Sequence, residues 1–170
     1  MKLARSITIN VPAEKAWHIV AHDFANIGDW SSGVAKSENN VKAHVPDEAT
    51  VGGRVCTVPG FGQIREAFTQ YDARNMRFTY EAKGMPFFVK SAHNSWKIEA
   101  VDANTSRASF QVEMILLPVI GAVMSIPMRI QLTSLLDDIV EELKYFAETG
   151  TVHPRKQKLI AKTNRVATTS

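Results

Sequence analysis

The sequence has little cysteine and lacks a recognisable secretory signal. Cys56 is its single cysteine, so no internal disulfide can form and a hydrophobic core must hold the fold together. The N-terminal residues MKLARSITINVPAEK lack the continuous apolar stretch of a signal peptide. Both observations predict a reducing, cytoplasmic setting.

Long hydrophobic runs are also missing. The most apolar stretch, residues 114–128, is interrupted by Pro118, Gly121, Ser125 and Pro127. It is shorter than the roughly 20 residues that a helix needs to cross a bilayer. We therefore expect no membrane span.

Excess positive charge is confined to the C-terminus. The chain has 20 basic and 17 acidic residues, a net charge of +3. Residues 151–170 contain no acid and five basic residues, namely Arg155, Lys156, Lys158, Lys162 and Arg165. The remaining body is slightly acidic, which argues against a nucleic-acid-binding surface. We expect residues 151–170 to form a solvated or loosely docked basic tail, or alternatively a weak contact for an acidic partner or membrane surface.

Motifs for common catalytic and cofactor chemistry are absent as well. The sequence has no G-x-S-x-G motif, and Cys56 has no recognisable histidine partner. His18 and His22 are spaced like metal ligands on a helix, but no third ligand accompanies them. We expect neither a metal nor a cofactor.

What the sequence does contain is a regular pattern of apolar residues. Ile7, Ile9 and Val11 alternate with polar residues, which predicts an opening strand. Pro12 ends that strand and favours a short helix, and a second short helix is predicted to end at Gly28. The first strand should therefore be followed by two short helices.

The pattern then changes to a period of two between residues 34 and 116. Turn signals divide this region into six predicted strands, at Asn39-Asn40, Gly52-Gly53, Gly60-Phe61-Gly62, Asp72, Gly84 and Asp102-Ala103-Asn104. From Leu132 to Phe146 apolar residues recur at helical spacing, which predicts a helix that stops at Gly150. We expect an α+β fold in which a curved antiparallel sheet of about seven strands wraps around this long C-terminal helix.

Several short strings occur in the order of a known family. They are VPAEKAW at 11–17, FANIGDW at 24–30, GGRV at 52–55, IRE at 64–66, and Tyr71-Asp72 followed by RFTY at 77–80. Together with the order of elements they resemble the START-like (SRPBCC) superfamily, in particular its polyketide cyclase/dehydratase branch. The resemblance implies a helix-grip domain over residues 1–150, a tail over 151–170, and an internal cavity for an apolar ligand.

Glu66 is the candidate catalytic residue. Strand parity places it between Ile64 and Phe68 on the apolar face, where an unpaired carboxylate is costly. It would act as a general acid or base, or hold a ligand hydroxyl or carbonyl. Alternatively, it pairs with an interior arginine such as Arg54 or faces water at a register break.

Tyr80 and Asn94 share the inward parity and offer a hydroxyl and an amide, although Tyr80 would also fit as a core residue and a bulge would turn Asn94 to solvent. Strand parity is ambiguous for Arg54, which would reach a ligand carboxylate or pair with Glu66. The aromatic candidates either line the cavity or fill the core, and they are Trp30, Phe61, Phe68, Phe78, Phe87, Trp96 and Phe110.

The leading hypothesis is a cytoplasmic protein that binds a small hydrophobic or aromatic molecule, such as a lipid, polyketide or sterol-like compound. The first alternative is a polyketide cyclase/dehydratase that uses Glu66 with Tyr80 or Asn94 in the same cavity. The second is a protein-interaction module that uses the sheet edge or the basic tail. Assembly as a homodimer is left open.

Overall fold

The computed structural model describes the chain over residues 1–168 and its side chains as far as Lys162. The strands are β1 (Lys2–Ile9), β2 (Lys36–Asn39), β3 (Gly53–Val58), β4 (Gly62–Asp72), β5 (Arg77–Lys83), β6 (Val89–Asp102) and β7 (Thr105–Leu116). The helices are α1 (Ala13–Trp17), α2 (Ile27–Trp30), α3 (Pro118–Thr149) and α4 (Pro154–Thr168), with a π-helical turn at His18–His22 and a 3₁₀ turn at Phe24–Asn26.

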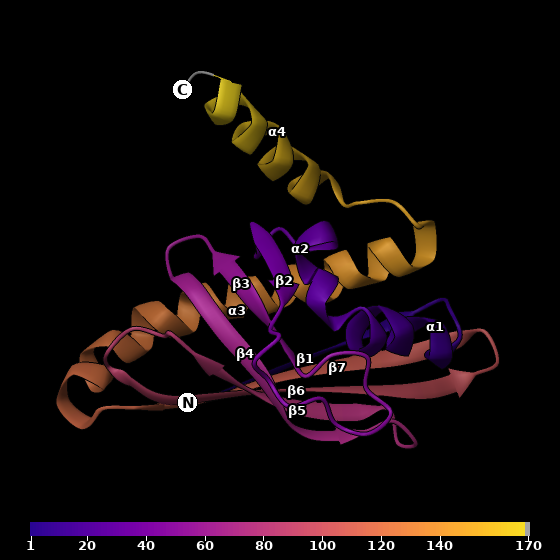
Figure 1. Cartoon of the computed structure of the whole chain (residues 1–170), viewed down its shortest axis with the longest axis horizontal. Coiled ribbons are helices and arrows are strands. Elements are labelled where there is room, and N and C mark those ends of the chain that lie inside the picture. The colour runs from indigo at the N-terminus through magenta and orange to yellow at the C-terminus, as the bar shows by residue number, and fades with distance from the viewer. Residues whose placement is uncertain (169–170) are drawn as a thin grey trace.

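Within the described residues, the seven strands form one antiparallel sheet in the order β1-β7-β6-β5-β4-β3-β2. The sheet lies along α3, as Figure 1 shows. Alternate side chains of β7 are buried, including Phe110, Val112 and Met114, because successive residues of a strand point to opposite faces. The six strands predicted between residues 34 and 116 are thus confirmed.

The short helical segments close one end of the sheet. Pro12 precedes α1, as predicted, and the ring of Trp17 lies 5.7 Å from that of Phe78 on β5. Phe24, in the 3₁₀ turn, lies 4.5 Å from Phe68 on β4. The helical segment therefore fills this end of the sheet with aromatic rings.

Helix α3 supplies the other half of the core. Leu132, Leu136, Ile139 and Leu143 are buried against the sheet, and the helix ends at Gly150, whose φ of 69° suits glycine. By length and composition α3 is apolar enough to cross a membrane, but its second half is the core helix of the domain.

The beginning of α3 differs from the expectation. The sequence suggests a loose stretch after Pro118, whereas the structure has a continuous helix from that residue with Pro127 inside it. A proline removes one backbone hydrogen bond of a helix, yet the remaining turns continue past it here. The first half of α3 is thus as regular as the second.

The tail forms helix α4, which extends away from the sheet (Figure 1). Its first turn is docked, because Arg155 forms ion pairs with Asp138, Glu141 and Glu142 of α3. The neighbouring Lys156 is buried, and its Nζ donates to the Val34 carbonyl over 2.6 Å. The start of the tail is therefore part of the packed body.

Candidate ligand cavity

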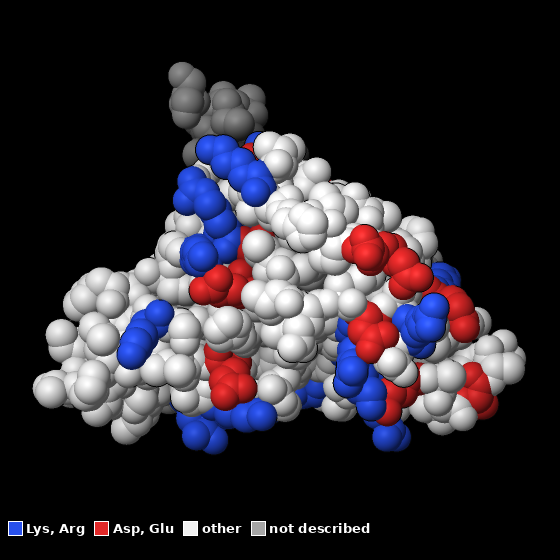
Figure 2. Space-filling view, turned by 60° about the horizontal axis from the view of Figure 1, so that its bottom comes forward, with Lys and Arg blue, Asp and Glu red and all other residues white. Residues whose placement is uncertain are grey.

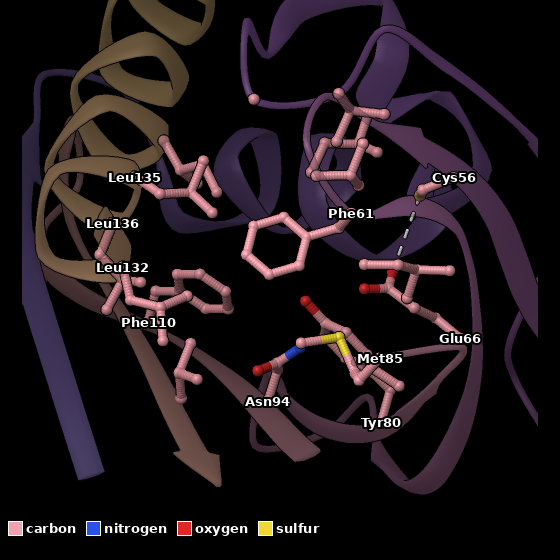
Figure 3. Close-up of a pocket in the computed structure, with 18 of the residues that line it drawn as sticks. Cys56, Phe61, Glu66, Tyr80, Met85, Asn94, Phe110, Leu132, Leu135 and Leu136 are labelled. Atoms are coloured by element: carbon pink, nitrogen blue, oxygen red, sulfur yellow. Dashed lines mark hydrogen bonds between the residues drawn. The ribbon is translucent and has the colours of Figure 1, made fainter. Parts of the chain in front are cut away.

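A cavity of about 90 Å³ lies between the sheet and α3. Strands β3 to β7 form its walls, and Leu132, Leu135, Leu136 and Ile139 of α3 cover it. The ring of Phe61, from the turn between β3 and β4, points toward its centre in Figure 3. Most of the lining is apolar, which suits an apolar guest.

One corner of the cavity holds a buried ion pair between Arg54 and Glu66. The two residues lie directly opposite each other on β3 and β4, and their exposed fractions are 4% and 8%. Nε of Arg54 donates to Oε2 of Glu66. Glu66 is therefore inside, as strand parity predicts, but Arg54 neutralises its charge.

Arg54 is fixed by further contacts. Its Nη1 donates to the Phe24 carbonyl over 2.9 Å and its Nη2 to the Tyr80 hydroxyl over 3.3 Å. Its guanidinium lies 3.9 Å from the centroid of the Phe24 ring, a cation–π contact. Burial by itself lowers the pKa of Arg54, but the attraction and hydrogen bond of Glu66, together with the effects of Cys56 and Tyr80, outweigh it and the pKa is raised. Arg54 is thus a permanent, structurally held cation.

The neighbouring thiol and phenol stay protonated. Burial, with repulsion from Glu66, raises the pKa of Cys56 to about 12 despite the opposing effect of Arg54. The Cys56 thiol lies 3.9 Å from Oε2 of Glu66, to which it donates (dashed in Figure 3). Burial and the same carboxylate also raise the pKa of Tyr80. At neutral pH this corner therefore offers hydrogen-bond donors rather than nucleophiles.

Asn94 adds an amide to the cavity wall. It lies on β6 directly opposite Tyr80 and is 9% exposed. Among the described residues, four buried side-chain oxygen or nitrogen atoms have no hydrogen-bond partner, and Asn94 Oδ1 is the one that belongs to a cavity-lining residue. A buried polar atom without a hydrogen-bond partner lowers the stability of the fold. A ligand group that donates to Asn94 Oδ1 would therefore offset this cost and gain binding free energy.

The structure brings most of the predicted site residues together. Those that line the cavity are Arg54, Phe61, Glu66, Tyr80, Asn94, Trp96 and Phe110. Trp96 and Phe110 face each other on β6 and β7, and their rings stack 4.4 Å apart. Strand parity predicted the inward direction of five of these residues, but it was ambiguous for Arg54 and does not apply to Phe61, which lies in a turn. Their roles toward a ligand remain predictions.

Four aromatic candidates lie elsewhere. Trp30 is buried against Phe146 of α3, with ring centroids 6.5 Å apart. Phe68 and Phe78 pack against each other at 5.2 Å in the aromatic end of the core, where Phe24 covers them. Phe87 lies in the loop between β5 and β6 and is 78% exposed. Strand parity does not apply to a loop, so the direction of this side chain could not be predicted from the sequence. None of these four residues lines the cavity, in contrast to the ligand-binding expectation, and three of them pack in the core.

The candidate list from the sequence lacked lining residues from two loops and from α3. Met85 comes from the loop between β5 and β6, and Gly33 and Val34 come from the segment after α2. No periodic signal distinguishes such loop residues. Leu132 and Leu135 were assigned to the inner face of the helix, but helical spacing did not show which of its turns lie over the cavity.

Comparison with known families agrees with this architecture. A family model described as "Polyketide cyclase / dehydrase and lipid transport" matches residues 1–145. The chain belongs to this family. The START-like resemblance inferred from the sequence is confirmed. A search of curated proteins found no sequence match.

Solved structures show the same fold at low sequence identity. A START superfamily protein from Mycobacterium smegmatis has a TM-score of 0.69 and 15% identity, over 88% of this chain and 99% of that one. The Zhui aromatase/cyclase from Streptomyces sp. R1128 has a TM-score of 0.62 and 13% identity, over 90% and 99% of the chains. Norcoclaurine synthase from Thalictrum flavum, in complex with dopamine and hydroxybenzaldehyde, has a TM-score of 0.60 and 12% identity, over 84% and 85%. The helix-grip fold is thus shown, and binding and catalysis both occur among proteins that share it.

Proposed function

We propose that this chain is a soluble, cytoplasmic binding protein for a small apolar or aromatic molecule that carries one hydrogen-bonding group. The observation that carries the proposal is an apolar cavity with a single unpaired amide oxygen, Asn94 Oδ1, on its wall. The apolar body of the ligand would lie against Trp96, Phe110 and α3. Its hydroxyl or N–H group would donate to Asn94.

The size of the cavity limits the ligand unless Phe61 moves. Its 90 Å³ is small beside the roughly 300–1,000 Å³ of typical ligand pockets. Phe61 is flanked by Gly60 and Gly62, both at φ near 80°, and neither glycine has other atoms close to the position of a Cβ. The space around both glycines is therefore open, and outward rotation of Phe61 would enlarge the cavity for a bicyclic or larger guest.

The state of the polar corner favours binding over catalysis. A general base needs a free lone pair near the reacting proton, and Arg54 and Cys56 both donate to Oε2 of Glu66, so a ligand proton would have to reach the other oxygen, Oε1. Cys56 and Tyr80 keep their protons at neutral pH. Cyclisation or dehydration in the same cavity is the alternative, and it would require a ligand that places its reacting proton at Oε1 of Glu66.

Native mass spectrometry of freshly purified protein tests the proposal directly. We expect a small molecule to co-purify and to be released on denaturation. The double variant Leu132→Trp/Leu136→Trp places bulk in the cavity and should lose that mass, whereas Ile130→Trp, on the exposed face of α3, should retain it. Retention of the mass by the double variant would place the ligand outside the cavity.

A pair of model ligands tests the role of Asn94. 1-Naphthol should bind more tightly than naphthalene by about fivefold, because one hydrogen bond contributes about 1 kcal/mol. The preference should vanish in Asn94→Leu and persist in Asn39→Leu, whose side chain is exposed on β2. Equal affinity of the wild-type protein for the two compounds would argue against Asn94 as the polar contact.

A further inference from the structure

The first half of α3 has an apolar outward face. In the second half, the outward positions carry Asp137, Glu141, Lys144 and Glu148. Three- and four-residue steps backward along that face lead through Ser134 to four exposed apolar side chains, which are Ile130, Ile126, Val123 and Val119. The outward face of α3 is thus charged in the second half of the helix and apolar in its first turns.

The exposed apolar surface extends around the helix and onto a neighbouring loop. Ile120 and Met124 are exposed on the flank, and the buried residues between Pro118 and Ile130 are Gly121 and Met128. The Leu117 amide, at the start of α3, donates to the Phe88 carbonyl, so the exposed Phe87 lies beside the first turn. We call Phe87, Val119, Ile120, Val123, Ile126 and Ile130, which are 46% to 80% exposed, the apolar tip.

Positive groups border the apolar tip. No charged residue occurs between Lys83 and Lys90 or between Glu113 and Arg129. The charged side chains at this end include Lys2, Lys83, Lys90 and Arg129, against the two carboxylates of Glu81 and Glu113. Lys83 pairs with Glu81 over 3.2 Å, and Lys2 lies opposite Glu113 across the strands. The border therefore has a net positive charge.

Figure 2 shows the same arrangement on the surface. The left end of the molecule, where Figure 1 places the first turns of α3, is almost entirely uncharged, while charged side chains of both signs occur across the middle and right of that face. Soluble monomers rarely expose a contiguous apolar surface of this kind without a partner.

We propose that the apolar tip inserts into the surface of a bilayer that contains anionic lipid. A helix that is apolar around most of its circumference suits a lipid environment, and a net positive border suits anionic headgroups. The uncharged part of α3, residues 118–128, is about 16 Å long at 1.5 Å per residue, so it lies in the interface and does not span. A second copy fits less well, because two-fold pairing would bring the two positive borders together.

The apolar tip lies close to the cavity, so docking would bring the cavity close to the membrane. Met85, in the loop that carries Phe87, lines the cavity, and so does Leu132, one turn after Met128. A tip held in the headgroup region would therefore bring the cavity next to the lipid phase. Docking itself depends on the exposed surface alone and does not rest on the ligand proposed above.

Flotation with vesicles of equal parts phosphatidylcholine and phosphatidylglycerol tests the proposal. The wild-type chain should float with these vesicles, and added salt should weaken binding. Val123→Ser/Ile126→Ser should weaken binding at least about tenfold, because two apolar side chains no longer enter the interface. The matched control Val41→Ser/Val101→Ser removes exposed valines away from the tip and should bind like wild type.

Three further measurements distinguish membrane insertion from self-association and from misfolding of a variant. The tryptophan added in Phe87→Trp should emit at a shorter wavelength when vesicles are present, because its indole moves from water into the lipid interface. The wild-type spectrum provides the baseline for the three native tryptophans. Light scattering after size exclusion reports the oligomeric state, and thermal unfolding confirms that each variant is folded. Failure of the wild type to float, equal losses in both double variants, or a dimer that the tip variant dissociates would each overturn the proposal.

Discussion

At the scale of single residues, the cavity is defined by how its polar groups are partnered. Glu66 and Arg54 neutralise each other, and the guanidinium also holds Tyr80 and the Phe24 carbonyl. Asn94 remains with an unpaired oxygen. The sequence left three hypotheses open for Glu66, namely a free acid or base, a partner of an interior arginine, and a residue that faces water at a register break, and the geometry is that of the second.

Removing the charge of Glu66 should destabilise the fold. In Glu66→Gln the buried Arg54 cation loses its counter-charge, so the free energy of unfolding should fall by about 3 kcal/mol. Glu99→Gln is the control, because Glu99 pairs with Lys97 in an exposed position and should change stability by less than about 1 kcal/mol. Urea unfolding measures both, and equal small losses would show that water reaches the pair.

The Cys56 thiol should make stability depend on alkaline pH. Its pKa is about 12 in the folded protein and 9.0 as the ordinary value, so between these pH values the unfolded chain loses a proton that the folded chain keeps. Stability should therefore fall as pH rises above 9, and the raised pKa of Tyr80 acts in the same direction. Urea unfolding at pH 8 to 10.5 should show a shallower fall in Cys56→Ala. Parallel curves for the two proteins would contradict the buried, protonated thiol.

At the scale of elements, α3 has two different halves. Leu136 is buried against the sheet, whereas Ile130, less than two turns earlier, is 68% exposed. Helical periodicity correctly predicted the inner face of the second half. It could not show that the first half continues as helix through Pro127, or that this half extends where the sheet no longer covers it.

A pair of alanine substitutions distinguishes the halves. Leu136→Ala should lower the free energy of unfolding by about 2–5 kcal/mol, because it leaves a cavity in the core. Ile130→Ala removes a similar side chain from an exposed site and should change it by less than about 0.5 kcal/mol. A large effect of Ile130→Ala would mean that another surface covers the tip in solution.

At the scale of the whole molecule, the tail is tied to the domain. Arg155 pairs with Asp138 and Glu141, and also with Glu142, which is fully buried and accepts hydrogen bonds from Ser32. We propose that the domain continues past residue 150 to include the first turn of α4. The rest of residues 151–170 keeps the basic character noted in the sequence.

This boundary can be tested by single substitutions. Arg155→Ala leaves Glu142 with less compensation for its buried charge, so the free energy of unfolding should fall by about 1–3 kcal/mol. Lys158→Ala removes an exposed charge from the same helix and should change it by less than about 0.5 kcal/mol. If the two variants unfold alike, the packed domain ends near residue 150.

The strands, the short helices after the first strand and the inner face of the second half of α3 could be predicted from the sequence alone. Period-two alternation placed Glu66, Asn94 and Trp96 on the inner face, and Gly150 marked the end of the long helix. These features are local, because side-chain direction in a strand and the stop of a helix depend on neighbouring residues. They were therefore predictable without any knowledge of the partners.

Only the tertiary structure decided which side chains meet. The cross-strand register places Arg54 directly opposite Glu66. Phe24 packs against Phe68 and Phe78 at the end of the sheet, outside the cavity. The length of α3 beyond the sheet leaves its first turns apolar and exposed. Each of these depends on residues far apart in the chain, and contacts between distant segments leave no periodic signal in a single sequence.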